Sequence, residues 1–170
     1  MATSPPAAAK HVEGKYKFAF STGDPSEKIK RSDINTVFIA SRHDSHARFV
    51  LEALKHGKHV FTEKPLCLTE AELNTIANEY VKAGVQLMVG FNRRFAPLSE
   101  KLKKALPADA PVSIHMRVNA GAVAADHWTQ NPAIGGGRIL GEACHFIDYA
   151  SWLAGSRIRK VSAMAIDDAQ

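Results

Sequence analysis

The stretch that decides the fold is residues 36–40 (TVFIA), a β-branched and aromatic run of the kind that forms a strand buried on both faces of a parallel sheet. Two similar short runs follow at 59–62 (HVFT) and 86–90 (QLMVG). The segments between these runs, 46–55 and 69–83, carry apolar residues at helical spacing. Strands that alternate with helices in this way predict an α/β fold, with parallel strands, flanking helices and right-handed crossovers.

Local signals mark the ends of the predicted helices. Thr69 and Glu72 have the spacing of a capping box at the start of the second helix, and Gly57 and Gly84 are typical helix stops. A further helix is predicted at 97–106, after the third strand.

The two ends of the chain have other patterns. Residues 16–21 (YKFAFS) predict a short strand, whereas residues 112–120 (VSIHMRVNA) and 160–166 (KVSAMAI) predict antiparallel strands on either side of an apolar helix at 139–154. We therefore expect a poorly ordered tail, a first domain with the parallel sheet, and the start of an α+β domain with antiparallel strands, over residues 1–15, 16–110 and 111–170 respectively.

The composition excludes several classes of protein. The chain has 170 residues, with 22 Lys plus Arg against 17 Asp plus Glu, and its basic residues are scattered, so we expect no nucleic-acid partner. Cys67 and Cys144 are too few for a disulfide framework. No apolar run reaches the ~20 residues of a membrane span, and the chain does not start with a secretory signal. We expect a cytoplasmic protein that is not bound to a membrane.

Polar residues follow each predicted strand of the parallel sheet, at 41–46 (SRHDSH), 63–65 (EKP) and 92–94 (NRR). The carboxyl ends of parallel strands meet at one edge of a sheet, and ligands of such sheets bind there. His43 and His46 are spaced to chelate a metal ion, but no third ligand has a suitable spacing, so we expect no metal site.

Three motifs in order, at 60–65 (VFTEKP), 90–95 (GFNRRF) and 135–148 (GGGRILGEACHFID), resemble the Gfo/Idh/MocA oxidoreductases, which include glucose–fructose oxidoreductase and inositol dehydrogenase. The resemblance covers about residues 30–170. It implies a partial Rossmann-type dinucleotide-binding domain, NAD or NADP as cofactor, and hydride transfer at a secondary alcohol or keto carbon of a sugar, polyol or sugar derivative.

The resemblance also implies that the chain is a fragment, because family members are larger at both ends. The sequence contains no GxGxxG, and the three glycines at 135–137 do not follow a buried strand, so they are not a dinucleotide fingerprint. The alternative function is therefore a catalytically inert binding or assembly module. A homo-oligomer, or a partner chain that completes the sheet, stays open.

Lys64 and His145 are the predicted catalytic residues. The resemblance gives Lys64 a catalytic role near the nicotinamide, and a histidine suits removal of the hydroxyl proton as hydride leaves. The structural alternatives are an exposed lysine at a strand end and a core histidine bonded to a carbonyl. The family pattern has an aspartate four residues before the histidine, whereas this chain has Gly141 there and Glu142 one place later.

The remaining site residues are expected on the cofactor or the substrate. The residues predicted to bind the cofactor lie in the polar turns: Ser41, Arg42, His43, His46, Glu63, Lys64, Asn92 and Arg93. Those predicted to bind a carbohydrate-like substrate are Arg94, Trp128, Glu142 and His145. For Arg93 and Arg94 the alternative is an interdomain salt bridge, for Trp128 a buried anchor, and for His46 a role in starting its helix.

Overall fold

The computed structural model describes residues 1–2 and 6–165 of the chain. The chain divides into two compact units. Unit 1 comprises residues 1–90 and 122–144, and unit 2 comprises residues 91–121 and those from 145 onward.

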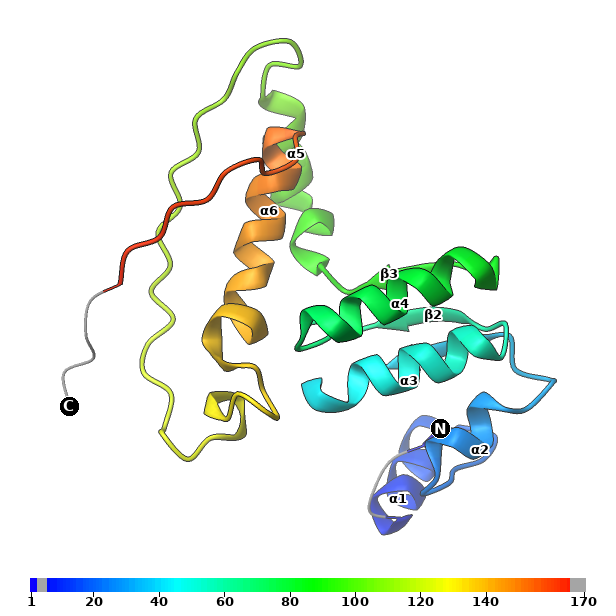
Figure 1. Cartoon of the computed structure of the whole chain (residues 1–170). Coiled ribbons are helices and arrows are strands. Elements are labelled where there is room, and N and C mark those ends of the chain that lie inside the picture. The colour runs from blue at the N-terminus through cyan, green and yellow to red at the C-terminus, as the bar shows by residue number, and fades with distance from the viewer. Residues whose placement is uncertain (3–5, 166–170) are drawn as a thin grey trace. The chain divides into compact units, whose positions relative to one another are not determined.

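Unit 1 contains a three-stranded parallel sheet in the order β1-β2-β3 (Figure 1). The strands are β1 (Thr36–Ile39), β2 (His59–Thr62) and β3 (Leu87–Val89). In the register of the sheet, Val37 lies beside Val60 and Val60 beside Leu87. The predicted α/β class and its parallel strands are therefore confirmed.

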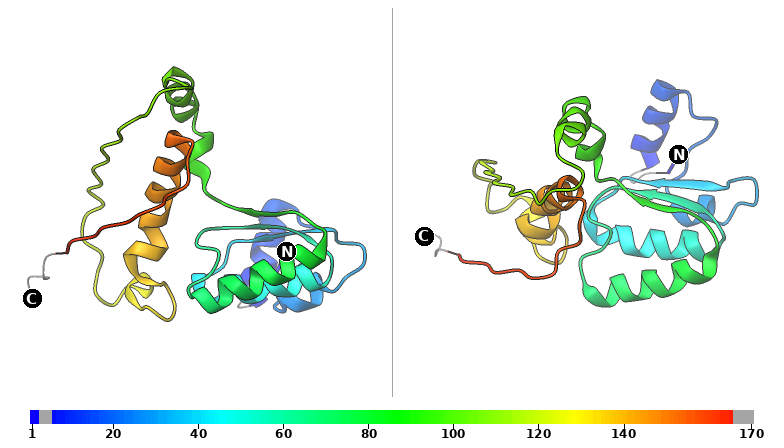
Figure 2. Two further views of the ribbon diagram at one scale, coloured as in Figure 1. Left: turned by 45° about the horizontal axis from the view of Figure 1, so that its top comes forward. Right: turned by 90° about the horizontal axis from the view of Figure 1, so that it is seen from above.

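Two helices cover one face of this sheet (Figure 2). These are α3 (His43–Lys55) and α4 (Glu70–Ala83). The core between them and the sheet contains Val50 and Leu54 from α3, Ile76 from α4 and Val60 from β2. The predicted capping box is present, because the Thr69 hydroxyl accepts from the Glu72 amide while the Glu72 carboxylate accepts from the Thr69 amide. Helix α4 ends at Gly84, which has the left-handed φ of 62° that glycine tolerates best.

The opposite face of the sheet is not covered, so the expectation of burial on both faces is wrong for the described residues. Phe38, Phe61 and Met88 stand side by side on that face, and the Phe38 side chain is 75% exposed. Right-handed crossovers explain this, because two successive crossovers in one direction along the sheet put both helices on the same side.

The N-terminal region contains two short helices, α1 (Pro6–Tyr16) and α2 (Pro25–Ile29). The structure differs here from the expected tail, since residues 6–16 are helical and Ala9 is buried. The strand predicted at 16–21 is wrong, because this segment pairs with no strand among the described residues; an isolated bridge joins the neighbouring Thr22 to Ala2.

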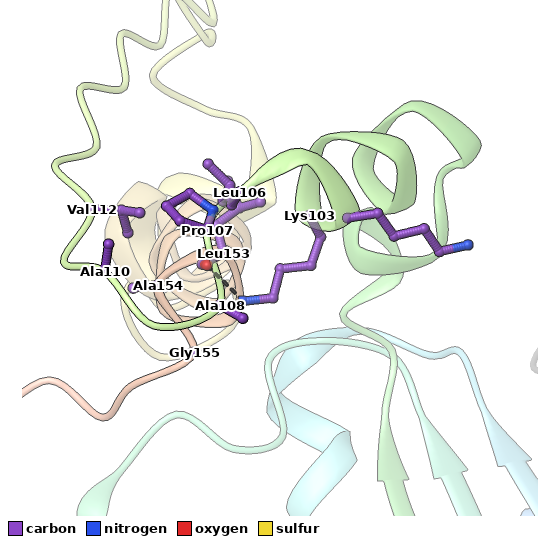
Figure 3. A pocket seen from close by; sticks show the side chains of 10 residues that line it. Lys103, Leu106, Pro107, Ala108, Ala110, Val112, Leu153, Ala154 and Gly155 are labelled. Atoms are coloured by element: carbon purple, nitrogen blue, oxygen red, sulfur yellow. Dashed lines mark hydrogen bonds between the residues drawn. The ribbon is translucent and has the colours of Figure 1, made fainter.

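Unit 2 is built on α5 (Pro97–Ala105), which follows the 3-10 turn η1 (Asn92–Phe95), and on α6 (Cys144–Ala154) from its second residue onward. Lys103 Nζ donates to the carbonyl oxygen of Leu153 at 2.7 Å, and this bond ties α5 to the end of α6 (Figure 3). A shallow hollow of about 410 Å³ surrounds the bond and is lined mostly by small and apolar residues such as Leu106, Pro107 and Val112.

The antiparallel strands predicted at 112–120 and 160–166 do not form in the described residues, and residue 166 lies outside them. Both segments are extended but have no hydrogen-bonded neighbour, and their apolar side chains Val161 and Met164 are 74% and 101% exposed. An extended segment becomes a stable strand only when it is paired within a larger sheet. None of the helices in the described part combines the length and apolar character needed to span a bilayer.

The capping box makes a first prediction about stability. Thr69→Ala removes the hydroxyl that accepts from the Glu72 amide, so the free energy of unfolding should fall by about 1 kcal/mol. Thr75→Ala in the same helix is the matched control, because that exposed hydroxyl only bonds back to the Ala71 carbonyl. Urea unfolding of both variants measures the difference, and equal losses would contradict a capping role for Thr69.

Candidate functional site

The turn after β1 leads directly into α3. Ser41 and Arg42 are exposed there, and the Ser41 and Ser45 hydroxyls lie 2.5 Å apart. The guanidinium of Arg42 lies over the Trp128 ring at 5.7 Å. Because the Asp44 amide donates to the Ile134 carbonyl at 3.1 Å, a segment distant in sequence also caps the first turn of the helix.

His43 is buried at the start of α3, where its side chain contacts this same segment. Its Nδ1 is 2.9 Å from the Gly135 carbonyl oxygen, and its ring meets Trp128 edge-on at 4.8 Å between centroids. Burial, followed by the nearby charges of Lys64 and His46, lowers the pKa of His43 even though the Gly135 carbonyl opposes this. The ring is therefore held as neutral imidazole, with Nδ1–H donating to Gly135.

His46 lies one turn further along α3 and is 0% exposed. Its Nδ1 is 2.7 Å from the Pro65 carbonyl oxygen and its Nε2 is 3.0 Å from that of Ser41. The ring thus joins the turns that follow β1 and β2. Its place among the cofactor contacts stays a prediction, and this burial does not favour it.

Lys64 follows β2 and points toward the turn before α6. Its Nζ donates to the Gly141 carbonyl oxygen at 2.6 Å, and both groups are at least half-buried. Gly141 lies in a π-helical turn (Ile139–Ala143), a rare widening of the helix that often marks functional sites. The structure therefore places the predicted catalytic lysine against a specific backbone oxygen.

Gly141 is required by close packing. A Cβ on this residue would lie 3.0 Å from the Gly135 oxygen and 3.2 Å from His43 Cε1. Gly90, at the end of β3, is similar, because a Cβ there would lie 3.1 Å from Phe61 Cζ and 3.2 Å from Glu63 Oε2. The sequence analysis missed both glycines as site residues; their only signal was their position inside the motifs that carry the resemblance.

Glu142, a predicted substrate residue, is paired within its own helical turn. Its carboxylate accepts from Arg138 Nε at 3.1 Å and from an Arg138 terminal nitrogen at 2.8 Å. The carboxylate is still 42% exposed, so it can also bind a ligand. Its role on the substrate stays a prediction.

The predicted residues Asn92, Arg93, Arg94 and His145 belong to unit 2. Arg93 lies over the Phe146 ring at 4.4 Å, and the His145 ring lies 6.1 Å from that of Phe91. Arg94 makes a bidentate pair with Asp148, which raises the pKa of the guanidinium. This ion pair holds η1 to α6. The ligand roles of the four residues stay predictions.

The polar groups at the ends of β1 and β2 suit part of a dinucleotide. The Ser41 hydroxyl and the Glu63 carboxylate can accept or exchange hydrogen bonds with ribose hydroxyls, and the exposed Arg42 guanidinium suits a phosphate. Among the described residues, no group of three or more His, Cys, Asp or Glu side chains is arranged to hold a metal ion.

A parallel sheet with such groups beyond the carboxyl ends of its strands defines a nucleotide-binding domain of the Rossmann type. Residues 2–91 match the model of an oxidoreductase family with an NAD-binding Rossmann fold, and residues 110–169 match the Gfo/Idh/MocA C-terminal domain. The chain belongs to the Gfo/Idh/MocA oxidoreductase family.

Characterised relatives include dehydrogenases of polyols and sugars. The chain is 32% identical to myo-inositol 2-dehydrogenase of Thermotoga maritima over 152 residues, and 34% identical to inositol 2-dehydrogenase 2 of Paenarthrobacter aurescens over 152 residues. These matches cover 89% and 85% of this chain, and the chain spans 44% of the length of each relative.

Solved structures show the same fold. Levoglucosan dehydrogenase in complex with NADH and levoglucosan matches with a TM-score of 0.75 and 26% identity, over 91% of this chain and 44% of that one. GenD2 from gentamicin A biosynthesis, in complex with NAD, has a TM-score of 0.75 but only 19% identity, which shows the fold alone.

The packing of Gly141 makes a second prediction. Gly141→Ala should lower the free energy of unfolding by about 1–3 kcal/mol, because the new methyl group displaces the Gly135 carbonyl or the His43 ring. Gly14→Ala is the control, since a Cβ at that helical position meets nothing within 4 Å. Chemical unfolding of both variants measures the difference. A Gly141→Ala variant as stable as the unaltered chain would show that the glycine packing is not needed.

Proposed function

We propose that this chain is the part of an NAD(P)-dependent oxidoreductase that acts on a secondary alcohol or keto carbon of a sugar, polyol or sugar derivative. The observation that carries the proposal is the position of Lys64, whose Nζ lies 2.6 Å from the Gly141 carbonyl oxygen beyond the end of β2. The polyol and sugar dehydrogenases among the relatives support the same substrate class.

The Gly141 carbonyl leaves Lys64 able to act on a substrate. A lysine ammonium has three N–H donors, and the carbonyl accepts from one of them. The other two are available for the oxygen of a bound alcohol or ketone. A positioned N–H of this kind stabilises the negative charge that develops on a keto oxygen, or returns a proton to it.

In the oxidative direction, the C–H bond of the alcohol carbon breaks and both its electrons leave with the hydrogen as hydride. The nicotinamide, when bound, supplies the acceptor for that hydride. We assign removal of the hydroxyl proton to His145, since imidazole is a suitable base near neutral pH, and we assign to Lys64 a hydrogen bond to a substrate oxygen. Reduction of the ketone runs through the same groups in reverse.

The cofactor residues are proposed from the polar turns. Ser41, Arg42 and Glu63 are open to a ligand, and their hydroxyl, guanidinium and carboxylate groups match ribose and phosphate. On the substrate side we propose Trp128, Arg94 and Glu142. Apart from Arg94, this division corresponds to a dinucleotide-binding region over 16–110 and a substrate region from 111 onward, which the ranges of the two family matches support.

The second candidate is a catalytically inert binding or assembly module. The absence of GxGxxG from the sequence and the exposed row of Phe38 and Met88 favour it. A chain of this kind would pair with a second copy or with a partner that completes the sheet, and it would bind no dinucleotide. Cofactor binding therefore separates the two candidates.

Calorimetric titration with NADH and NADPH is the test of cofactor binding. We expect saturable micromolar binding of one of them, and Arg42→Ala should weaken it about tenfold, because a charge-assisted hydrogen bond to phosphate contributes about 1.5 kcal/mol or more. Arg48→Ala is the matched control, an exposed arginine further along α3. No binding at millimolar concentrations of either nucleotide would favour the inert module.

The role of Lys64 is tested by turnover with a panel of polyols and anhydrosugars that includes myo-inositol and levoglucosan. Lys64→Met should lower kcat by about 10²–10⁴-fold while the dissociation constant of the cofactor changes little. Lys82→Met, at an exposed position near the end of α4, should leave kcat unchanged. Full activity of Lys64→Met would contradict the assignment, and a wild-type chain that forms no NADH with any member would contradict the reaction.

A further inference from the structure

The segment from residue 134 to residue 141, called here the glycine segment, is held to the end of the sheet by its backbone oxygens. Ile134 accepts from the Asp44 amide, Gly135 from His43 and Gly141 from Lys64, at 3.1, 2.9 and 2.6 Å. Each donor lies beyond the carboxyl end of β1 or β2. The glycine segment therefore sits where these two strands end.

His43 is the side chain at the centre of these contacts. It is only 8% exposed, its Nδ1 holds Gly135, and the Cα of Gly141 packs so closely on its ring that a methyl group there would lie 3.2 Å from Cε1. The Trp128 ring meets the His43 ring edge-on, at 4.8 Å between centroids. Loss of the ring would leave both the Gly135 oxygen and the Gly141 backbone without their neighbour.

We propose that His43 is a positioning residue that keeps the glycine segment docked, so that the Gly141 carbonyl is presented to the Lys64 ammonium, and that protonation of His43 releases the segment. The consequence for turnover rests on the proposed function, whereas the docking itself does not. This role differs from the cofactor contact that the sequence predicted for His43.

Protonation opposes docking mainly because the His43 ring is buried. Lys64 from the end of β2 and His46 from α3 also disfavour a charge on the ring, whereas the Gly135 carbonyl and Asp44 favour it. Arg42 and His127 each lie beside the Trp128 ring, at 5.7 and 5.8 Å from its centroid. A charged His43 is best accommodated by leaving this environment for water.

The direction of the pH dependence follows from the lowered pKa of docked His43. Above the ordinary histidine pKa of about 6.5 the ring is neutral whether docked or released, so docking is complete. As the pH falls below that value, the released form takes up a proton and the docked form does not. Docking therefore weakens on the acidic side of neutrality.

Trp128 reports the state of His43 without any assay of activity. The chain has two tryptophans, so Trp152→Phe leaves Trp128 as the single emitter. We expect a change in its fluorescence with a midpoint below about pH 6.5, since protonated imidazole quenches a neighbouring indole and release exposes it. His43→Asn keeps a side-chain N–H for Gly135 but does not titrate, so it should abolish the transition.

Two further variants make the measurement decisive. His127→Asn removes the other imidazole beside Trp128 and should leave the transition intact, because His127 is exposed and its Nδ1 bonds to Thr129 and not to the glycine segment. His43→Ala should shift Trp128 emission to the red at every pH. Persistence of the transition in His43→Asn, or its absence from the parent chain, would overturn the proposal.

Amide hydrogen exchange of the unaltered chain needs no substitution at His43. The protection factor of the Asp44 amide, which donates to Ile134, should fall at least tenfold between about pH 7 and about pH 5. The Val60 amide, bonded to Gln86 within the sheet, should keep its protection. If the protection factors of the two amides changed equally with pH, the proposed release of the glycine segment would be wrong.

If the chain oxidises a substrate, the base His145 gives kcat an acidic limb of its own, and His43 should add a component with the midpoint of the fluorescence change, which His43→Asn should remove. A fluorescence transition without turnover would sink the proposed function but leave the docking role in place. Turnover whose acidic limb is identical in the parent chain and in His43→Asn would contradict the positioning role but leave the proposed function intact.

Discussion

The constraint on which the rest of unit 1 depends is the handedness of its two crossovers. Each connection between neighbouring parallel strands must turn to the right, and the strands follow one another in the order β1-β2-β3. Both helices therefore fall on one face, and the turns that leave β1 and β2 lie next to each other at one edge. Ser41 and Lys64 therefore lie at the same edge of the sheet, although 22 residues, including all of α3, separate them in the sequence.

Backbone oxygens, more than side-chain carboxylates, organise that edge. His43, His46 and Lys64 each lie against a carbonyl oxygen, on Gly135, Pro65 and Gly141 respectively. Glycine stands at both 135 and 141 because a side chain would collide there: a Cβ at Gly135 would lie 2.3 Å from the Thr129 Cα, and one at Gly141 would lie 3.0 Å from the Gly135 oxygen. These two glycines thus serve close packing of the backbone.

The electrostatics of the same edge are unusual for a buried site. Two imidazoles and one ammonium lie close together, with Asp44 as the one carboxylate among the charges that act on His43. Burial and the nearby Lys64 and His46 favour the neutral ring, which keeps one N–H for the Gly135 carbonyl, so the proposed docking holds while His43 is uncharged. A site of this composition attracts anionic ligands and is sensitive to mild acid.

Local patterns determined much of this protein. The runs TVFIA and HVFT form strands, the capping box at Thr69 forms, and the motifs around Lys64 and His145 identified the family, because each depends on residues that are near one another in sequence. The predicted strands at 16–21, 112–120 and 160–166 failed for the opposite reason. A strand needs a partner, and a local pattern of side chains carries no information about whether one is present.

Only the tertiary structure decided which groups meet. No spacing rule connects His43 with Gly135, 92 residues away, or Lys64 with Gly141, 77 residues away. The charge of Arg94 likewise suggested a ligand contact, whereas in the structure its guanidinium donates hydrogen bonds to the Asp148 carboxylate. Sequence determines which chemistry each residue carries and which helix or strand it joins, whereas the pairing of distant groups depends on how those elements pack, and packing is set by the chain as a whole.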